Sequence, residues 1–424
     1  GDHNFNKIRG MYMIKKTLAV IMVLAIAASF IGCGEKKIDK TAWADMEITV
    51  GAFRDFNDAP RLEGYKMGAD KFTEEYGTKV NFMLAGGDGM GDDIVAAIMS
   101  GNPWQIQFVW GISVLPLAYN EDLYVPITEY VDFDKNDKID KLSMDANYWK
   151  GEYYGISALP MQEIYYVVYN ETWMKELGIK TPYEYYEEGK WNWDAYKTIC
   201  AKAVEAGSGT RSEVRRPHTG RKYMSKWDLD KGEVTITYDS PENVEWLNFW
   251  GDLITNPRYD YFHQGYVSER GIMMRDNVMP EIMEYEITND TNDVIRYINF
   301  PGKDGEVSSY MTDGHFMFVN GISEEELQCS IELATYMVDE QSKKVDSLYK
   351  ENMNEEDYAI WEKTLDNITF LPGAFYDGVW EIGDKFIADM KAGKSVATHI
   401  AENTESLKAK AEEYNEKYAE GYNK

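Results

Sequence analysis

The hydrophobic positions of the chain alternate between the two-residue period of strands and the 3.6-residue period of helices. Residues 46–53 have the pattern of a strand, and residues 60–76 place their apolar side chains on one helical stripe that ends at Gly77. A strand, a helix and a strand follow at 80–84, 92–100 and 106–110. These repeats predict an α/β fold with mostly parallel sheets, in which ligands gather at the carboxyl ends of the strands.

The middle of the chain carries clear start and stop signals. Residues 154–158 and 164–169 are predicted strands separated by a break at Pro160. Asn170 then caps a predicted helix that stops at Gly178. Further signals predict a helix that starts at Asn192 or Asp194 and ends at Gly207, a hairpin turn at Lys231-Gly232, and a helix opened by Ser240-Pro241.

The amino end has the order of a secretory signal peptide. Lys15 and Lys16 precede an apolar stretch, residues 18–31, that is shorter than the ~20 residues a membrane-spanning helix needs. We expect residues 1–32 to be removed. Met13 is the expected start, which leaves residues 1–12 as a tag or an over-extended gene prediction.

The residues at the end of this stretch, Phe30 to Cys33, resemble the bacterial lipoprotein processing site, in which the cysteine receives the lipid. Phe30 departs from the leucine usual in that pattern. The resemblance implies a lipid anchor on Cys33, and a plain signal peptide is the alternative.

Charge and cysteine content exclude several classes of function. The formal net charge of −29 repels phosphate backbones and argues against nucleic acid as a partner. Cys200 and Cys329 lie in predicted helices without metal-ligand spacing, so we expect two buried free thiols, with a bridge between them as the alternative. Residues 132–143 begin like a calcium loop but lack its glycine and its final glutamate. We predict no metal and no cofactor.

Residues 153–200 resemble the crossover segment of ABC-transporter extracellular solute-binding proteins of the sugar-binding, maltose-binding-protein-like type. The shared order is Tyr-Asn, a helix, a proline, then Trp-Asn-Trp-Asp and a second helix. Residues 299–305 resemble the family's PFPGPDG turn, and residues 315–319 resemble the strand that returns to the first lobe. The segment 207–222, a short basic loop, departs from the family.

This resemblance implies a two-lobed periplasmic-binding-protein-like fold of type II, in which each lobe is a mostly parallel sheet flanked by helices and crossing hinge strands join the two. The implied first lobe is 43–157 plus 316–345, and the second is 158–315 plus 346–424. The implied function is to capture a carbohydrate, and more specifically an oligosaccharide, between the lobes for an ABC permease. We expect a monomer on the extracellular side of the membrane, or on its periplasmic face in a Gram-negative cell.

Candidate ligand-binding residues cluster at predicted strand ends, because sugars need flat aromatic faces and oxygen acceptors for their hydroxyls. Trp110 and Tyr376 match stacking positions of the family, and Glu163 matches a hydroxyl-binding carboxylate. The predicted set is Arg54, Asp55, Asp88, Trp110, Gln162, Glu163, Arg275, Asp276, Asp313, Phe375 and Tyr376.

Some of these residues also have purely structural interpretations. Asp55 is a candidate helix cap and Asp88 a candidate turn residue. His315 borders the returning strand, where it either lines the hinge or serves the core. A glycoside hydrolase that uses two carboxylates is the alternative function, and a surface sugar sensor or adhesin is another.

Overall fold

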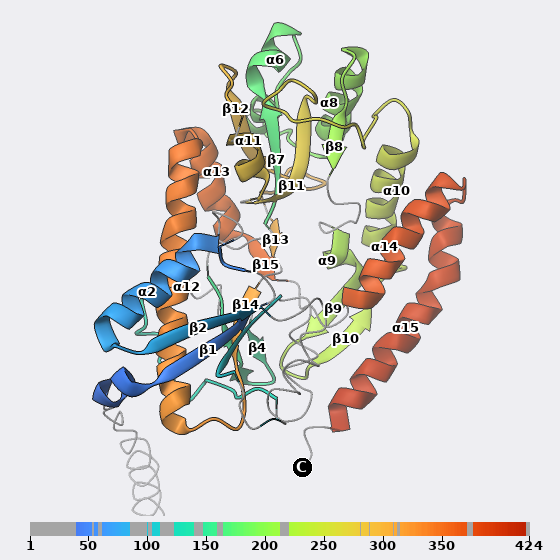
Figure 1. Cartoon of the computed structure of the whole chain (residues 1–424). Helices are drawn as coiled ribbons and strands as arrows, with labels where there is room; N and C mark the ends of the chain where they lie inside the picture. Colours follow the sequence, from blue (N-terminus) through green and yellow to red (C-terminus); the bar gives the residue numbers. More distant parts are fainter. Residues whose placement is uncertain are drawn as a thin grey trace, which may run out of the picture. The chain divides into compact units, whose positions relative to one another are not determined.

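The structure is a computed structural model (Figure 1). It describes residues 40–52, 55–57, 62–84, 100, 104–110, 123–139, 147–158, 164–212, 220–279, 281–287, 289–307, 309–311, 314–370 and 376–420. The chain separates into two compact units, 1–44 and 45–424. The predicted signal segment, with Met13 and Cys33, lies outside the described residues. The elements discussed below belong to the second unit.

A five-stranded sheet, called the first sheet, has the order β2-β1-β3-β14-β6. Its strands are β1 (Glu47–Ala52), β2 (Lys79–Leu84), β3 (Ile106–Trp110), β6 (Gly155–Ile156) and β14 (Gly314–Phe318). β1 runs parallel to both β2 and β3, as the repeated strand–helix units predict. β14 is antiparallel to β3 and to β6. The strand that returns late in the chain therefore completes this sheet.

Two helices, α2 (Glu63–Tyr76) and α12 (Glu324–Asn352), pack side by side (Figure 1). α2 ends at Gly77, whose left-handed φ of 79° is the conformation expected of a terminating glycine. α12 starts at a capping box formed by Ser323 and Glu326. The sequence pattern predicts a helix over residues 323–338, and α12 continues well beyond this end.

A four-stranded sheet, the second sheet, has the order β12-β7-β11-β8. Its strands are β7 (Ile164–Asn170), β8 (Thr210–Ser212), β11 (Met274–Met279) and β12 (Ile295–Asn299). Only β8 and β11 pair in parallel, and β7 is antiparallel to both of its neighbours. The prediction of a mostly parallel sheet does not hold here. β7 follows β6 of the first sheet in the chain, so it is not preceded by a strand–helix unit of its own sheet, the arrangement that would make it parallel to a neighbour.

Apolar side chains cover both faces of the second sheet. Tyr165, Val167 and Tyr169 of β7 lie in one buried cluster, and Ile164, Tyr166 and Val168 lie in another. Because side chains alternate along a strand, β7 is buried on both sides. Val345 and Tyr349, in the second half of α12, belong to the cluster of Tyr166. α12 therefore contacts α2 with its first half and its middle, and it contacts the second sheet from Val345 onward.

The remaining elements surround these sheets. They are β4 (Tyr148–Trp149), β5 (Glu152–Tyr153), α6 (Glu171–Glu176), α7 (Pro182–Glu187), α8 (Trp193–Glu205), α9 (Arg221–Met224), β9 (Ser225–Asp228), β10 (Glu233–Ile236), α10 (Pro241–Thr255), α11 (Glu281–Ile287), β13 (Ser309–Met311), α13 (Glu355–Asp366), β15 (Ile368–Phe370), α14 (Tyr376–Lys391) and α15 (Val396–Glu420). No described helix has the length and apolar character needed to cross a bilayer.

The hairpin of β9 and β10 packs against residues near the first sheet. The Trp149 and Trp227 rings lie 5.8 Å apart, and Lys150 N donates to Leu229 O at 2.8 Å. The sequence prediction assigns the hairpin to the second lobe. The two predicted lobes therefore contact each other here, and their boundaries remain a prediction.

Candidate functional site

One edge of the first sheet gathers the strand ends that lead to several predicted site residues. Ala52 of β1 pairs with Phe108, and Trp110, the last residue of β3, pairs with Gly314 of β14. The segment after β1 and the segment before β14 therefore meet beside the end of β3. Arg54, Asp88 and Asp313 lie outside the described residues, and the strands next to them in the chain begin or end at this edge.

One edge of the second sheet gathers a matching set of strand ends. Ile164, the first residue of β7, pairs with Met279 at the end of β11, and Tyr166 pairs with Asn299 at the end of β12. Gln162 and Glu163, which precede β7, lie outside the described residues, as does Phe375. Tyr376 is the first residue of α14. Phe300, which directly follows β12, is buried in the cluster of Tyr165 and Tyr196 and belongs to the core.

Short connections join these two edges, which are called the candidate edges below. β6 leads to β7 through residues 157–163, which can span at most about 25 Å. β13 contacts β7 and is separated from β14 by only residues 312–313. Residues 157–163 and residues 300–313, called the crossing segments below, thus connect the candidate edge of one sheet to the candidate edge of the other.

Asp55 is exposed and forms a local turn. Its Oδ1 accepts hydrogen bonds from the Asn57 backbone N at 2.8 Å and from Asn57 Nδ2 at 2.7 Å. Both hydrogen bonds lower the pKa of Asp55, and the one from the Asn57 backbone has the larger effect. α2 has Leu62 as its N-cap residue without a side-chain cap bond, so the helix-cap interpretation of Asp55 is wrong. A charged, exposed acceptor stands just beyond the end of β1.

Asp276 is enclosed by tyrosines in the interior of the second sheet. Its carboxylate accepts hydrogen bonds from Tyr165 Oη at 2.7 Å, Tyr196 Oη at 2.9 Å and Tyr261 Oη at 2.9 Å. It lies in the middle of β11, while the candidate edge is at the strand's end. These contacts give Asp276 a structural role, and ligand binding through it stays a prediction.

Arg275 is equally enclosed. Its guanidinium lies 3.5 Å from the Glu286 carboxylate and within 4.9 Å of the Tyr285 ring centre. Both charged groups are fully buried, and Glu286 also accepts from Ser268 N at 2.8 Å. A buried ion pair of this kind holds α11 to the sheet, so a ligand role for Arg275 likewise stays a prediction.

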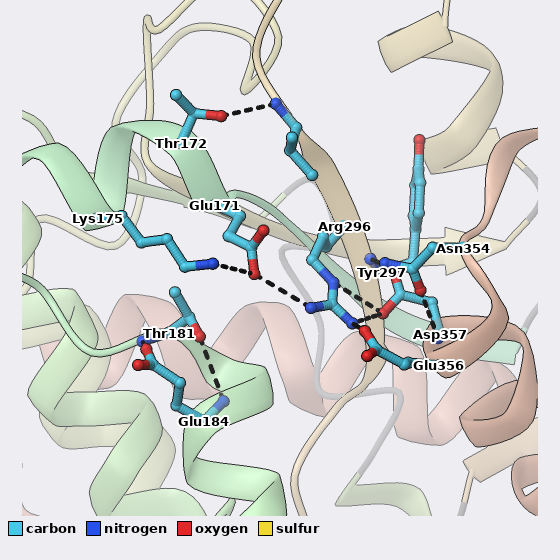
Figure 2. Close-up of polar contacts among 11 residues, drawn as sticks. Glu171, Thr172, Lys175, Thr181, Glu184, Arg296, Tyr297, Asn354, Glu356 and Asp357 are labelled. Atoms are coloured by element: carbon cyan, nitrogen blue, oxygen red, sulfur yellow. Dashed lines mark hydrogen bonds and ion pairs between the residues drawn. The ribbon is translucent and has the colours of Figure 1, made fainter.

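Sequence analysis missed a cluster of charged residues, shown in Figure 2. The buried Arg296 guanidinium donates to Asp357 Oδ1 at 2.7 Å, to Glu356 at 2.9 Å and to Glu171 at 3.1 Å, and it covers the Tyr183 ring at 4.1 Å. Burial raises the pKa of Asp357, against the hydrogen bonds from Arg296. The cluster joins α6, β12 and α13. Because the buried Arg296 ties together three elements that are far apart in the chain, we interpret the cluster as structural.

The described residues offer no metal centre and no reactive thiol. Among them, no group of three or more His, Cys, Asp or Glu side chains could hold a metal ion. In the calcium-like turn, Asp132 Oδ2 binds Lys135 Nζ at 2.5 Å. Cys200 and Cys329 are free and buried, as predicted, and burial raises the pKa of Cys329 to about 11.

Residues 58–265 match the model of the family described as bacterial extracellular solute-binding protein. This segment, 208 of the chain's 424 residues, resembles that family. The expected two-lobed fold class is confirmed by solved structures of similar fold. A comparison with curated proteins finds none that matches.

Three of these solved structures show the fold at low sequence identity. The cyclic alpha-maltosyl-1,6-maltose binding protein of Arthrobacter globiformis is 14% identical, with a TM-score of 0.66 over 86% of this chain and 99% of that one. An ABC substrate-binding protein of Listeria monocytogenes, in complex with cycloalternan, is 14% identical, with a TM-score of 0.64 over 85% and 98%. UgpB of Mycobacterium tuberculosis, in complex with glycerophosphocholine, is 11% identical, with a TM-score of 0.65 over 86% and 98%.

Proposed function

We propose that the protein is the solute-binding component of an ABC importer and captures a carbohydrate, more specifically an oligosaccharide, for delivery to a membrane permease. The family match supports solute binding. Two of the structures of similar fold are complexes with, or named for binding, cyclic saccharides. The third holds glycerophosphocholine, which makes the ligand class the first point to test.

The observation that carries this proposal is the direct linkage of the two candidate edges by the segments 157–163 and 300–313. Segments that cross between two sheets at their ligand-gathering edges can act as a hinge. Closure is favoured only by contacts that a ligand makes with both sides. We assign 43–157 plus 316–345 to one hinged lobe and 158–315 plus 346–424 to the other.

Within this scheme the binding residues divide between the two sides. Trp110 provides a flat apolar face from the first sheet, and Tyr376 provides a second face from α14. Glu163 and Gln162 accept or donate hydrogen bonds to hydroxyl groups at the start of β7. Asp55 adds an exposed acceptor beyond β1. No bond is made or broken, so no catalytic residue and no cofactor is assigned.

Cellular location completes the proposal. We place the mature protein on the extracellular side of the membrane, or on its periplasmic face in a Gram-negative cell, anchored by lipid on Cys33 and acting as a monomer. The order of signals around residues 15–33 supports this placement. Mass spectrometry of the membrane-extracted protein would show a lipidated amino terminus at Cys33. A free terminus at another residue would contradict the anchor.

The experiment is a binding panel with maltotetraose, mannotriose and glycerophosphocholine, read by thermal shift and calorimetry. A ligand that binds only the folded protein raises its melting temperature. Stoichiometric uptake without turnover of the saccharide supports a carrier, whereas release of shorter sugars supports a hydrolase. A sensor or adhesin would bind the saccharide without supporting its uptake. Cells with the gene deleted would then take up the saccharide as well as wild-type cells do in a transport assay.

A further inference from the structure

His315 lies where the two crossing segments leave the first sheet. It is the second residue of β14, and in the antiparallel register of β14 with β6 it falls opposite Ser157, the first residue of the other crossing segment. Its Nδ1 lies 2.7 Å from Ser157 Oγ and 2.5 Å from Asn147 Oδ1. Asn147 Nδ2 in turn donates to Ser157 Oγ at 2.9 Å. His315, Ser157 and Asn147 form a closed ring, called the hinge cluster below.

The chemistry of the three side chains determines which atoms donate and which accept in the hinge cluster. The Asn147 carbonyl oxygen can only accept, so His315 Nδ1 carries the proton and donates it. Burial lowers the pKa of His315 to about 3, so the imidazole is neutral at physiological pH. All three side chains are buried. Separating the segments would leave buried polar groups unsatisfied, which holds both segments in one arrangement.

The hinge cluster also lies next in the chain to the residues through which the predicted first lobe contacts the β9–β10 hairpin. Asn147 directly precedes Tyr148 and Trp149, which contact Asp230 and Trp227 of the β9–β10 hairpin. Gly155 permits the close approach of Asn147, because a β-carbon there would lie 2.7 Å from Asn147 Oδ1. The cluster therefore connects three segments: both crossings and the strand pair that touches the hairpin.

We propose that His315 is a positioning residue for ligand capture, which sets the relative arrangement of the two crossing segments through Ser157 and Asn147. It does not touch the ligand. This inference rests on the proposed function, in which the two sides move about these segments.

The chain supplies a matched control in His399. This second buried histidine bonds Tyr238 Oη at 2.8 Å and Asp389 Oδ2 at 2.7 Å, and it lies on α15 outside the crossing segments. Loss of either histidine removes two buried polar contacts. Only the loss of His315 should alter the hinge.

The experiment measures the distance distribution between nitroxide labels on Met67→Cys and Leu177→Cys, both exposed, by pulsed electron resonance in a Cys33→Ser background. The buried Cys200 and Cys329 are shielded from labelling. His315→Phe and the milder Ser157→Ala should shift or broaden the distribution in the absence of any saccharide. His315→Asn, which keeps a donor near the Nδ1 position, should restore it. His399→Phe should lower the melting temperature and leave the distribution unchanged.

With the panel ligand that wild type binds, His315→Phe should weaken affinity about tenfold, a change of the size expected for one buried hydrogen bond. If His315→Phe and Ser157→Ala give the wild-type distribution and lose only melting temperature, as His399→Phe does, the inference is wrong. Failure of wild type to bind any panel ligand would instead contradict the proposed function. The label distances need no ligand, so the two failures are distinguishable.

Discussion

Gly68 of α2 lies directly against Met337 of α12, so that a β-carbon on Gly68 would come within 2.5 Å of the Met337 Cα atom. One turn earlier, a β-carbon on Gly64 would come equally close to the Cα atom of Gln341. The two helices therefore touch backbone to backbone through a pair of glycines spaced four residues apart. This contact fixes the middle of α12 to the helix that follows β1.

Gly68→Ala should destabilise the fold by about 2 kcal/mol, because the added methyl group meets backbone atoms that cannot turn aside. Gly251→Ala in α10 is the matched control. Its β-carbon would find ordinary contacts at 3.4 Å and beyond, and alanine favours a helix by up to about 1 kcal/mol. Chemical denaturation of both variants checks this. Equal stability of the two would contradict the close packing.

Arg296→Met should cost about 3–5 kcal/mol, because it leaves the buried Asp357 carboxylate without its partner. Arg270→Met removes ion pairs to Glu176 and Asp293 in a more exposed place and should cost much less, because solvent screens exposed ion pairs. Urea midpoints compare the two. A similar loss in both variants would show that burial does not govern the Arg296 cluster.

Stability should fall as the pH drops below about 6.5, because unfolded histidine then binds a proton that folded His315 does not. The folded pKa of about 3 lies below the unfolded value, so its contribution is full above pH 6.5 and is lost as the pH falls toward 3. Between pH 7 and pH 5 the expected loss from this residue is about 2 kcal/mol. Urea denaturation of wild type and His315→Asn at both pH values tests it. An identical pH dependence in both proteins would contradict the assignment.

Trp110→Ala should weaken ligand binding by about tenfold to one-hundredfold, the effect expected of an aromatic anchor in a binding site. Glu163→Gln keeps the size of the side chain and should weaken binding less, since an amide still accepts one hydroxyl hydrogen bond. Tyr130→Ala, an exposed aromatic outside the candidate set, is the control and should bind as wild type. Calorimetry measures all three. Unchanged affinity in Trp110→Ala would exclude the stacking role.

The local elements were predictable because their signals are local. Asn170, Asn192 and Ser240 cap the helices they were predicted to cap, each accepting a hydrogen bond from a backbone N three residues on. Gly178 and Gly207 adopt the left-handed φ expected after a helix. Capping and chain reversal depend on a few neighbouring residues, and the sequence contains all of them.

The tertiary arrangement was less predictable because its partners are far apart in the chain. Nothing near Arg296 indicates that it pairs with Asp357, and nothing near Asp276 indicates that tyrosines from three segments donate to it. The second half of α12 is rich in charged residues, so its hydrophobic pattern is weak and does not predict that the helix continues toward the second sheet. The choice of an edge in the first sheet could be made from the sequence, since the rule that ligands gather at the carboxyl ends of parallel strands follows from chain topology, and it stays a prediction.

The most direct test of the account is calorimetric titration of the wild-type protein with maltotetraose, mannotriose and glycerophosphocholine, followed by analysis of the recovered ligand. The account predicts that a saccharide binds with one-to-one stoichiometry and is recovered intact. Binding of no saccharide, or recovery of cleaved products, would contradict it.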